Sequence, residues 1–314
     1  MSDRDSRVPP RRISERTVLA KAEYFQDIGL WPPRSEVDPV RWLRNFGRSG
    51  SEAREYAANL LNAFLFVSSP MVERLFYSAV HALSSSICDA ALTAGQDPTG
   101  AWNRFLEGLI VTYVEGEHHN PTKSGYAFAR MARQVLGLSQ MQILEPGEAL
   151  AISASQPDQP VLFVDDFVGS GNQMIGTWQR EYSSSVRSAR SFDDRAKSAP
   201  GRFYYCPLVC TEYGHQRLVC NCQELTVLPV HELGPSDSLV GSESSLWPES
   251  LKEGAEAFLL DSSRRAGIVG GSPLGWKGFH DLALGVAFEH CVPDATMPLF
   301  YWDRNGWFPL VRRT

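Results

Sequence analysis

Two adjacent carboxylates, Asp165 and Asp166, directly follow four apolar residues of high β-propensity, Val161 to Val164. A wholly apolar strand is typical of a parallel sheet that is buried on both faces. The carboxylates are then expected at the carboxyl edge of that sheet, where open α/β sheets bind their ligands. Successive side chains on an extended turn point apart, so this pair could hold two neighbouring hydroxyls, or one hydroxyl and Mg²⁺.

A short glycine-containing segment follows the carboxylates, and helical spacing resumes at Met174. Gly169 and Gly171 allow a ligand to approach the backbone closely, and the helix start behind them offers free N–H groups that suit a phosphate. A Walker phosphate loop is excluded because no Gly-Lys-Ser/Thr follows the glycines. The alternative is an ordinary buried strand that ends in an acidic turn.

This stretch resembles the ribose-phosphate motif of type I phosphoribosyltransferases. The resemblance implies that Asp165 and Asp166 hold the ribose 2′- and 3′-hydroxyls of a phosphoribosyl ligand, together with Mg²⁺. It also implies that the 5′-phosphate lies in the loop formed by Gly169, Ser170, Gly171, Asn172 and Gln173. Gln173 stands where that family usually has Thr or Ser, so one hydroxyl donor is missing.

A second anion site is expected after the apolar run 109–114, which predicts the first core strand. The polar loop 115–125 follows it and leads into an amphipathic helix. In the family resembled, this loop holds pyrophosphate. Lys123 is then its cation, Ser124 and Gly125 open the helix, and His119, like His118, adds charge or acts as acid or base. The alternative for each histidine is an exposed loop position.

Residues 141–144 predict the second strand, and residues 145–159 occupy the place of the mobile catalytic loop of the transferases. That loop usually supplies a Lys or Arg to the departing pyrophosphate. Here no Lys or Arg occurs between Arg133 and Arg180. Cations aimed at a leaving group are commonly the largest stabilising contribution. Either Mg²⁺, Lys123 and residues from elsewhere supply the charge, or the site binds without transfer.

The remaining pattern predicts a Rossmann-like α/β core with a parallel sheet and helices on both faces. Residues 203–209 and 225–230 predict further strands around a short helix at 213–218, and the polar segment 183–202 predicts a flexible insertion. Four regions are expected: a flexible basic arm at 1–16, a helical N-terminal region at 17–100, the core at 101–232 and a C-terminal hood at 233–314.

The composition limits the kinds of partner. The net charge of −6 and the pI near 5.7 give no general attraction to nucleic acid, although the arginine-rich arm could dock on nucleic acid or on a protein instead of being a solvated tail. No apolar run reaches the length of a membrane span and no signal peptide is present, so we expect a cytoplasmic protein with no membrane partner.

Four cysteines, at positions 206, 210, 220 and 222, lie near His215. Zinc binding is one alternative for this cluster. However, the spacing lacks a Cys-x-x-Cys knuckle, and Cys206 and Cys210 fall in an apolar run. Buried thiols are therefore favoured over a zinc-dependent nuclease.

The C-terminal segment predicts a helix over 278–290, followed by a Pro-rich stretch up to Trp302. This ending resembles the phosphoribosyltransferase-like family called PRTase-CE, as do Trp42 with Phe46 and the two loops above. Asp294 stands where Asn is usual. Either the ending is a clamp that packs its tryptophans on the core, or it is a hood in which Asp294 and Thr296 address a base or second substrate.

Members of that family resemble components of bacterial conflict systems, including phage defence of the retron kind. The resemblance implies an effector that binds a nucleotide or a phosphoribosyl pyrophosphate-like ligand and acts at the ribose anomeric carbon. A protein or nucleic-acid partner from a defence operon is also expected. The alternative is a nucleotide-sensing protein of such a system that retains the pocket without transfer activity.

Overall fold

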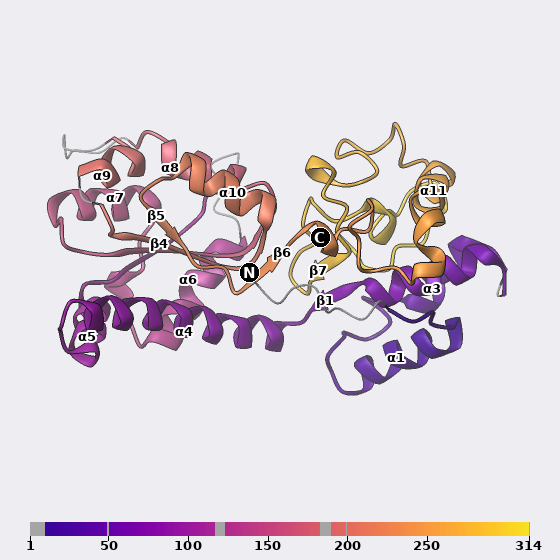
Figure 1. Ribbon diagram of the computed structural model, residues 1–314, viewed down its shortest axis with the longest axis horizontal. Coiled ribbons are helices and arrows are strands. Elements are labelled where there is room, and N and C mark those ends of the chain that lie inside the picture. The colour runs from indigo at the N-terminus through magenta and orange to yellow at the C-terminus, as the bar shows by residue number, and fades with distance from the viewer. Residues whose placement is uncertain (1–9, 49, 117–122, 183–189, 199, 314) are drawn as a thin grey trace. The chain divides into compact units, whose positions relative to one another are not determined.

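The computed structural model describes residues 10–48, 50–116, 123–182, 190–198 and 200–313, with the backbone alone at 123–127. The chain forms two compact units (Figure 1). Unit 1 contains residues 1–71 and 233–314, and unit 2 contains residues 72–232. The sequence had suggested separate helical, core and hood regions, whereas the structure groups the N-terminal helices with the C-terminal segment.

Unit 1 is built from helices and one small sheet. Its helices and strands are α1 (Glu15–Asp27), α2 (Pro39–Leu43), α3 (Glu52–Ala63), β1 (Leu65–Val67), α11 (Glu249–Arg265) and β7 (Val286–Phe288), with 3₁₀ turns at Arg44–Phe46, Pro235–Asp237, Phe279–Asp281 and Pro298–Phe300. Ser14 and Asp38 cap α1 and α2 through side-chain hydrogen bonds to backbone N–H groups. Pro39 occupies the first turn of α2, a position where its missing N–H costs no hydrogen bond.

Strands β1 and β7 pair in parallel, with Leu65 opposite Val286. This pairing joins segments that are far apart in the sequence and corrects one prediction. The helix predicted over 278–290 is instead a 3₁₀ turn followed by β7. Helical spacing cannot reveal these strands because each contains only three residues and takes its stability from a distant partner.

An aromatic core fills unit 1. The Trp42 ring is fully buried and stacks on Phe300, with 5.6 Å between the ring centroids. The indole N–H groups of Trp42 and Trp307 both donate to the Leu299 carbonyl, at 2.8 and 3.1 Å. The Trp302 indole donates to the Ala266 carbonyl at 2.9 Å. The C-terminal segment is thus packed on the core, as the clamp interpretation expects.

Unit 2 contains a five-stranded sheet. Strands β2 (Ile110–Tyr113), β3 (Val161–Val168), β4 (Phe203–Thr211) and β5 (Leu225–Val227) lie in that order and pair in parallel, and β6 (His231–Leu233) also pairs with β4. The register places Val161 opposite both Ile110 and Phe203. Carboxyl ends of parallel strands meet at one edge, so the residues at the ends of β2, β3 and β4 converge there.

Helices cover both faces of this sheet (Figure 1). They are α4 (Ser69–Thr93, which begins in unit 1), α5 (Pro98–Gly108), α6 (Lys123–Leu136), α7 (Pro146–Ser155), α8 (Asn172–Gln179), α9 (Phe192–Ser198) and α10 (Glu212–Asn221). Figure 1 shows α4, α5 and α6 below the sheet and α7 to α10 above it. The predicted α/β architecture, with a parallel sheet and helices on both faces, is confirmed.

The strand predicted at 141–144 is absent. Residues Gln140–Gln142 form a 3₁₀ turn, and Ile143 makes only a single bridge to Val111. The Gln142 side chain explains the turn: its amide donates to the carbonyls of Leu106 and Leu109 at 2.8 and 3.0 Å, and its oxygen accepts from the Ser139 N–H. A polar side chain that anchors a turn outweighs the apolar pattern around it.

Two segments predicted as loops are helical. Residues 146–155, placed in a mobile catalytic loop, form α7, in which Ala149 and Leu150 are fully buried. Within the predicted insertion 183–202, residues 183–189 lie outside the described part of the chain, but α9 is a packed helix. Its Phe192 is fully buried against Phe163, with 4.9 Å between the ring centroids.

Candidate functional site

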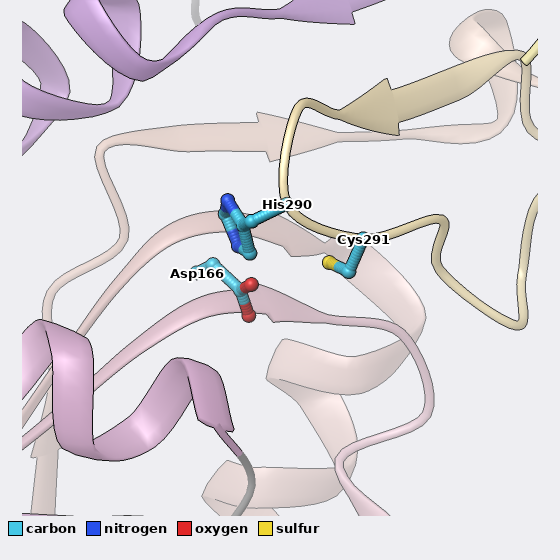
Figure 2. Close-up of side chains that lie close together, drawn as sticks. All are labelled: Asp166, His290 and Cys291. Atoms are coloured by element: carbon cyan, nitrogen blue, oxygen red, sulfur yellow. The ribbon is translucent and has the colours of Figure 1, made fainter. Parts of the chain in front are cut away.

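The acidic pair lies inside β3, because the strand continues to Val168 instead of ending before Asp165. Both carboxylates are largely buried, with exposed fractions of 7% for Asp165 and 6% for Asp166. Figure 2 shows the Asp166 carboxylate near the carboxyl end of its strand. The pair therefore lies at the sheet edge predicted from the sequence, held by strand pairing and not by a turn.

Asp165 is held by two hydrogen bonds within unit 2. The Tyr205 hydroxyl, on the neighbouring strand β4, donates to Asp165 Oδ2 at 2.9 Å, and the Asp166 N–H donates to Asp165 Oδ1 at 3.0 Å. Burial, followed by the nearby charge of Asp166, raises the pKa of Asp165 well above its ordinary value, and the Tyr205 bond opposes that rise. Two buried acidic groups this close together resist full ionisation, and a bound cation would stabilise their charged forms.

This donor set fits Mg²⁺. Carboxylate oxygens are the hard ligands that Mg²⁺ prefers. Each oxygen of a carboxylate offers two lone-pair positions, so the bonds from Tyr205 and from the Asp166 backbone leave acceptor capacity on Asp165. Asp165 and Asp166 would hold the ion, and the same oxygens can accept from ribose hydroxyls.

The loop after β3 turns sharply into α8. Gly171 is the N-cap of α8 and adopts φ 75°, a left-handed conformation that favours glycine. A Cβ at Gly171 would lie 3.3 Å from the Gly214 carbonyl of α10, and a Cβ at Gly214 would lie 2.4 Å from the Gly169 carbonyl. Helix α10 therefore packs directly against the loop backbone and fixes its path.

Thr211, the N-cap of α10, and Arg217, within that helix, hold this loop. The Thr211 hydroxyl donates to the Gly169 carbonyl and accepts from the Gly214 N–H at 2.9 Å. The Arg217 guanidinium donates to the Ser170 carbonyl at 2.5 Å and to Asn172 Oδ1 at 2.6 Å. A cation thus stands beside the segment expected to hold the 5′-phosphate. Its charge favours an anion at the same place as the α8 N-terminus.

The end of β2 carries a second polar cluster. Glu115 accepts hydrogen bonds from Arg180 and, at 2.5 Å, from the Tyr182 hydroxyl, while its N–H donates to the Thr177 hydroxyl at 3.0 Å. Burial, reinforced by Glu115, raises the pKa of Tyr182. These contacts connect the start of the 115–125 loop to the end of α8. Since α8 begins in the glycine loop, the same helix holds both predicted anion loops.

The other predicted residues of this loop are only partly described. His119 lies outside the described residues. Lys123, Ser124 and Gly125 open α6, as the sequence indicated, but the structure describes only their backbone. Their predicted roles toward pyrophosphate therefore stay predictions.

Asp294 and Thr296 belong to unit 1. Asp294 pairs with Arg313 at the surface. Thr296 is fully buried, and its hydroxyl donates to the Val286 carbonyl at 2.5 Å. Each side chain thus has a partner within the unit, and their predicted ligand contacts stay predictions. His290 and Cys291 lie on the turn that follows β7 (Figure 2).

A comparison with protein families decides the identity of this fold. The family model PRTase-CE matches residues 39–313, which include all of unit 2, unit 1 from α2 onward and the loops described above. The chain belongs to the PRTase-CE family. This confirms the resemblance seen in the sequence and supports a phosphoribosyltransferase-like function. A comparison with curated proteins finds no match.

Two further observations concern the helices and the cysteines of this PRTase-CE protein. None of the helices in the described ranges is both long and apolar enough to cross a bilayer. Burial raises the pKa of the Cys206, Cys210 and Cys222 thiols to about 12. In the part of the chain that the structure describes, these thiols do not come together with His215 as a metal-binding group, and His215 instead pairs with Glu232 at 2.8 Å.

Sequence reasoning missed two residues of the PRTase-CE site, Tyr205 and Arg217. Tyr205 could have been found, because a tyrosine in an apolar strand normally needs a partner for its buried hydroxyl. Arg217 falls in the helix predicted at 213–218, but only the close packing of α10 on the Gly169–Gly171 loop brings its guanidinium to that loop.

Proposed function

We propose that this PRTase-CE protein binds a phosphoribosyl ligand at the carboxyl edge of the unit 2 sheet and acts at its anomeric carbon. One observation carries the proposal. A buried acidic pair on β3 leads directly into a loop whose left-handed Gly171 opens α8 and whose carbonyls are held by Thr211 and Arg217. This arrangement suits a sugar with two free hydroxyls and a phosphate.

Each part of the site has a role in the proposal. Asp165 and Asp166 accept hydrogen bonds from the 2′- and 3′-hydroxyls and fix the sugar. Residues 169–173 receive the 5′-phosphate on the α8 N-terminus, where backbone N–H groups and Arg217 favour negative charge. Bound Mg²⁺ supplies charge stabilisation for the departing pyrophosphate. Lys123 neutralises the same leaving group, and His119 handles a proton.

The reaction proposed is a displacement. An acceptor lone pair forms a bond to the anomeric carbon, the bond from that carbon to pyrophosphate breaks with its electron pair on the leaving oxygen, and the acceptor loses its proton. Positioning supplies most of the advantage, because the protein needs no covalent intermediate.

A second function, nucleotide sensing without transfer, is supported by α7. The segment where transferases carry a mobile catalytic loop is here a helix with a buried apolar face, and it contains no Lys or Arg. A fixed helix cannot close over a leaving group. The binding half of the proposal is common to both functions, so the first test must separate binding from turnover.

The experiment uses the full chain with phosphoribosyl pyrophosphate, Mg²⁺ and a mixture of bases and nucleotides. Calorimetry measures binding, and a coupled assay measures pyrophosphate release. Binding with release supports transfer, and binding without release supports the sensing protein. Asp166→Asn is expected to weaken binding at least about tenfold, whereas the matched change Asp158→Asn at an exposed loop position leaves it unchanged. No binding by the wild type would overturn both functions.

We also propose that the chain is an effector of a bacterial defence system of the retron kind. The family membership supports this context, and the site supplies the chemistry. Phage plating on cells that express the gene with its neighbours tests it. Protection that Asp166→Asn removes and Asp158→Asn retains is the expected result, and equal protection by both variants would contradict an effector role for the site.

A further inference from the structure

Unit 1 contains a cleft of about 680 Å³ that none of the roles above uses. This volume lies within the range of small-molecule sites. Its charged lining consists of Arg41, Arg304, Arg312, Arg313 and one carboxylate, Asp303. The protein as a whole carries a net charge of −6. The cleft is therefore a local concentration of positive charge on an acidic protein, and an anion is its natural ligand.

The arginines are available to a ligand. Within the described residues, Arg41, Arg304 and Arg312 form no ion pair with a carboxylate, and Arg313 pairs with Asp294 at the cleft margin. All four arginines are exposed. A guanidinium that is unpaired keeps all its N–H donors for a planar, oxygen-rich partner such as phosphate.

Aromatic rings fix the guanidinium groups in place. The Arg41 guanidinium lies 4.4 Å from the centroid of the Phe308 ring, that of Arg313 lies 5.1 Å from Tyr301, and that of Arg304 lies 5.4 Å from Trp302. A guanidinium this close to a ring is attracted to it, and its planar group can also contact a base while its N–H donors reach phosphate oxygens. This geometry favours a ligand that combines an aromatic base with a phosphate over a simple anion.

The walls of the cleft are rigid. The Asn45 side-chain amide donates to the Phe308 carbonyl at 2.8 Å, and its oxygen accepts from the Phe308 N–H at 3.0 Å. The Trp302 and Trp307 rings are more than nine-tenths buried, and their indole N–H groups are bonded to core carbonyls. The cleft is thus preformed, and binding would not have to order it.

We propose that this cleft binds a nucleotide through its phosphate and base, either as a free nucleotide or as a unit of single-stranded nucleic acid. Unstacked bases and phosphates are what arginine–aromatic surfaces recognise in single strands. The site consists of unit 1 residues only, so it is independent of the acidic pair on β3.

The test measures fluorescence anisotropy of a labelled single-stranded oligonucleotide of about ten nucleotides with the full chain. Adenosine monophosphate and polyglutamate serve as competitors. The cleft variant is Arg304→Gln with Arg312→Gln, and the matched control is Arg48→Gln with Arg264→Gln, two exposed arginines of unit 1 outside the cleft. Thermal melts confirm that both variants fold, and Arg304→Lys keeps the charge while removing the planar group.

The cleft variant is expected to weaken binding at least about tenfold and to lower the slope of log affinity against log salt by about 1.4, since each phosphate contact contributes about 0.7. The control should change affinity less than about twofold. Competition by adenosine monophosphate assigns the site to free nucleotides, and its failure to compete assigns it to a strand.

Three results would overturn the proposal. One is equal weakening by the cleft and control variants, which indicates general charge attraction. Another is competition by polyglutamate as strong as that by the nucleotide. The last is a wild-type protein that binds neither the oligonucleotide nor the mononucleotide at low salt. If the double variant does not fold, Arg304→Lys decides alone, and unchanged affinity in that variant counts against the cleft.

Discussion

The hydrogen bond between Tyr205 and Asp165 offers the sharpest test of the unit 2 site. The Tyr205 hydroxyl is buried and donates to Asp165 Oδ2 at 2.9 Å. Tyr205→Phe removes one oxygen and leaves the ring in place. The carboxylate then loses a donor that stabilises its charged form, so the pKa of Asp165, already raised by burial and by Asp166, rises further.

The expected loss of stability depends on pH. A hydrogen bond to a charged group contributes about 1.5 to 3 kcal/mol, and one between neutral groups about 0.5 to 1.5 kcal/mol. Below the pKa of Asp165 only the smaller figure applies, because the carboxyl is protonated. As pH rises through that pKa the larger figure applies. The destabilisation by Tyr205→Phe should therefore grow by about 1 kcal/mol between acid and alkaline pH.

Thermal unfolding across a pH series measures this effect, and a change of 1 kcal/mol corresponds to about 2–4 °C in a unit of this size. The matched control is Tyr204→Phe on the same strand, whose hydroxyl bonds at 3.3 Å to the backbone carbonyl of Gly201 at the surface. The control should show a small loss that does not change with pH. A pH-independent loss in Tyr205→Phe, or equal losses in both variants, would refute the reasoning.

Three other predictions follow from single contacts. Asp165→Asn should become more stable than the wild type as pH rises above 3.8, because the folded carboxyl keeps a proton that the unfolded chain releases; parallel melting curves at all pH values would contradict this. Gly137 has a similar positive φ but open space around it, so Gly137→Ala should cost only the backbone strain of about 1 kcal/mol. Gly171→Ala should lower stability by more than that, and only this variant should weaken phosphoribosyl binding in calorimetry. Thr296→Val should cost about 1–3 kcal/mol in thermal melts by leaving the Val286 carbonyl without its donor; a normal melt with lost ligand affinity would assign Thr296 to the ligand instead.

Much of unit 2 could be predicted from local sequence. The apolar run at Val161 indicates a strand buried on both faces, and the glycine-containing segment after it indicates a turn that leads into a helix. Both features are confirmed because they depend on neighbouring residues alone. The N-terminal helices of unit 1 also depend on local sequence, since Ser14 and Asp38 cap them through their own side chains.

Features that depend on distant partners could not be predicted. The three-residue strands β1 and β7 exist because they pair with each other across most of the chain. Gln142 turns its segment into a 3₁₀ turn by bonding to carbonyls of α5 and of the residue that follows it. Arg217 reaches the glycine loop only through the packing of α10. The spacing of residues along the sequence does not predict such contacts.

The electrostatics of β3 are difficult to explain by stability alone. Apart from the acidic pair, all residues of β3 are apolar. An apolar side chain at position 165 would avoid the burial of charge beside Asp166. The Tyr205 bond offsets this cost only in part, since the pKa of Asp165 remains well above its ordinary value. A buried acidic pair that the fold does not fully compensate is an arrangement that a bound cation or sugar hydroxyls can complete. The same strand leads into a loop with the opposite preference, where Arg217 and the start of α8 favour an anion. A ligand that combines hydroxyls with a phosphate would satisfy both preferences.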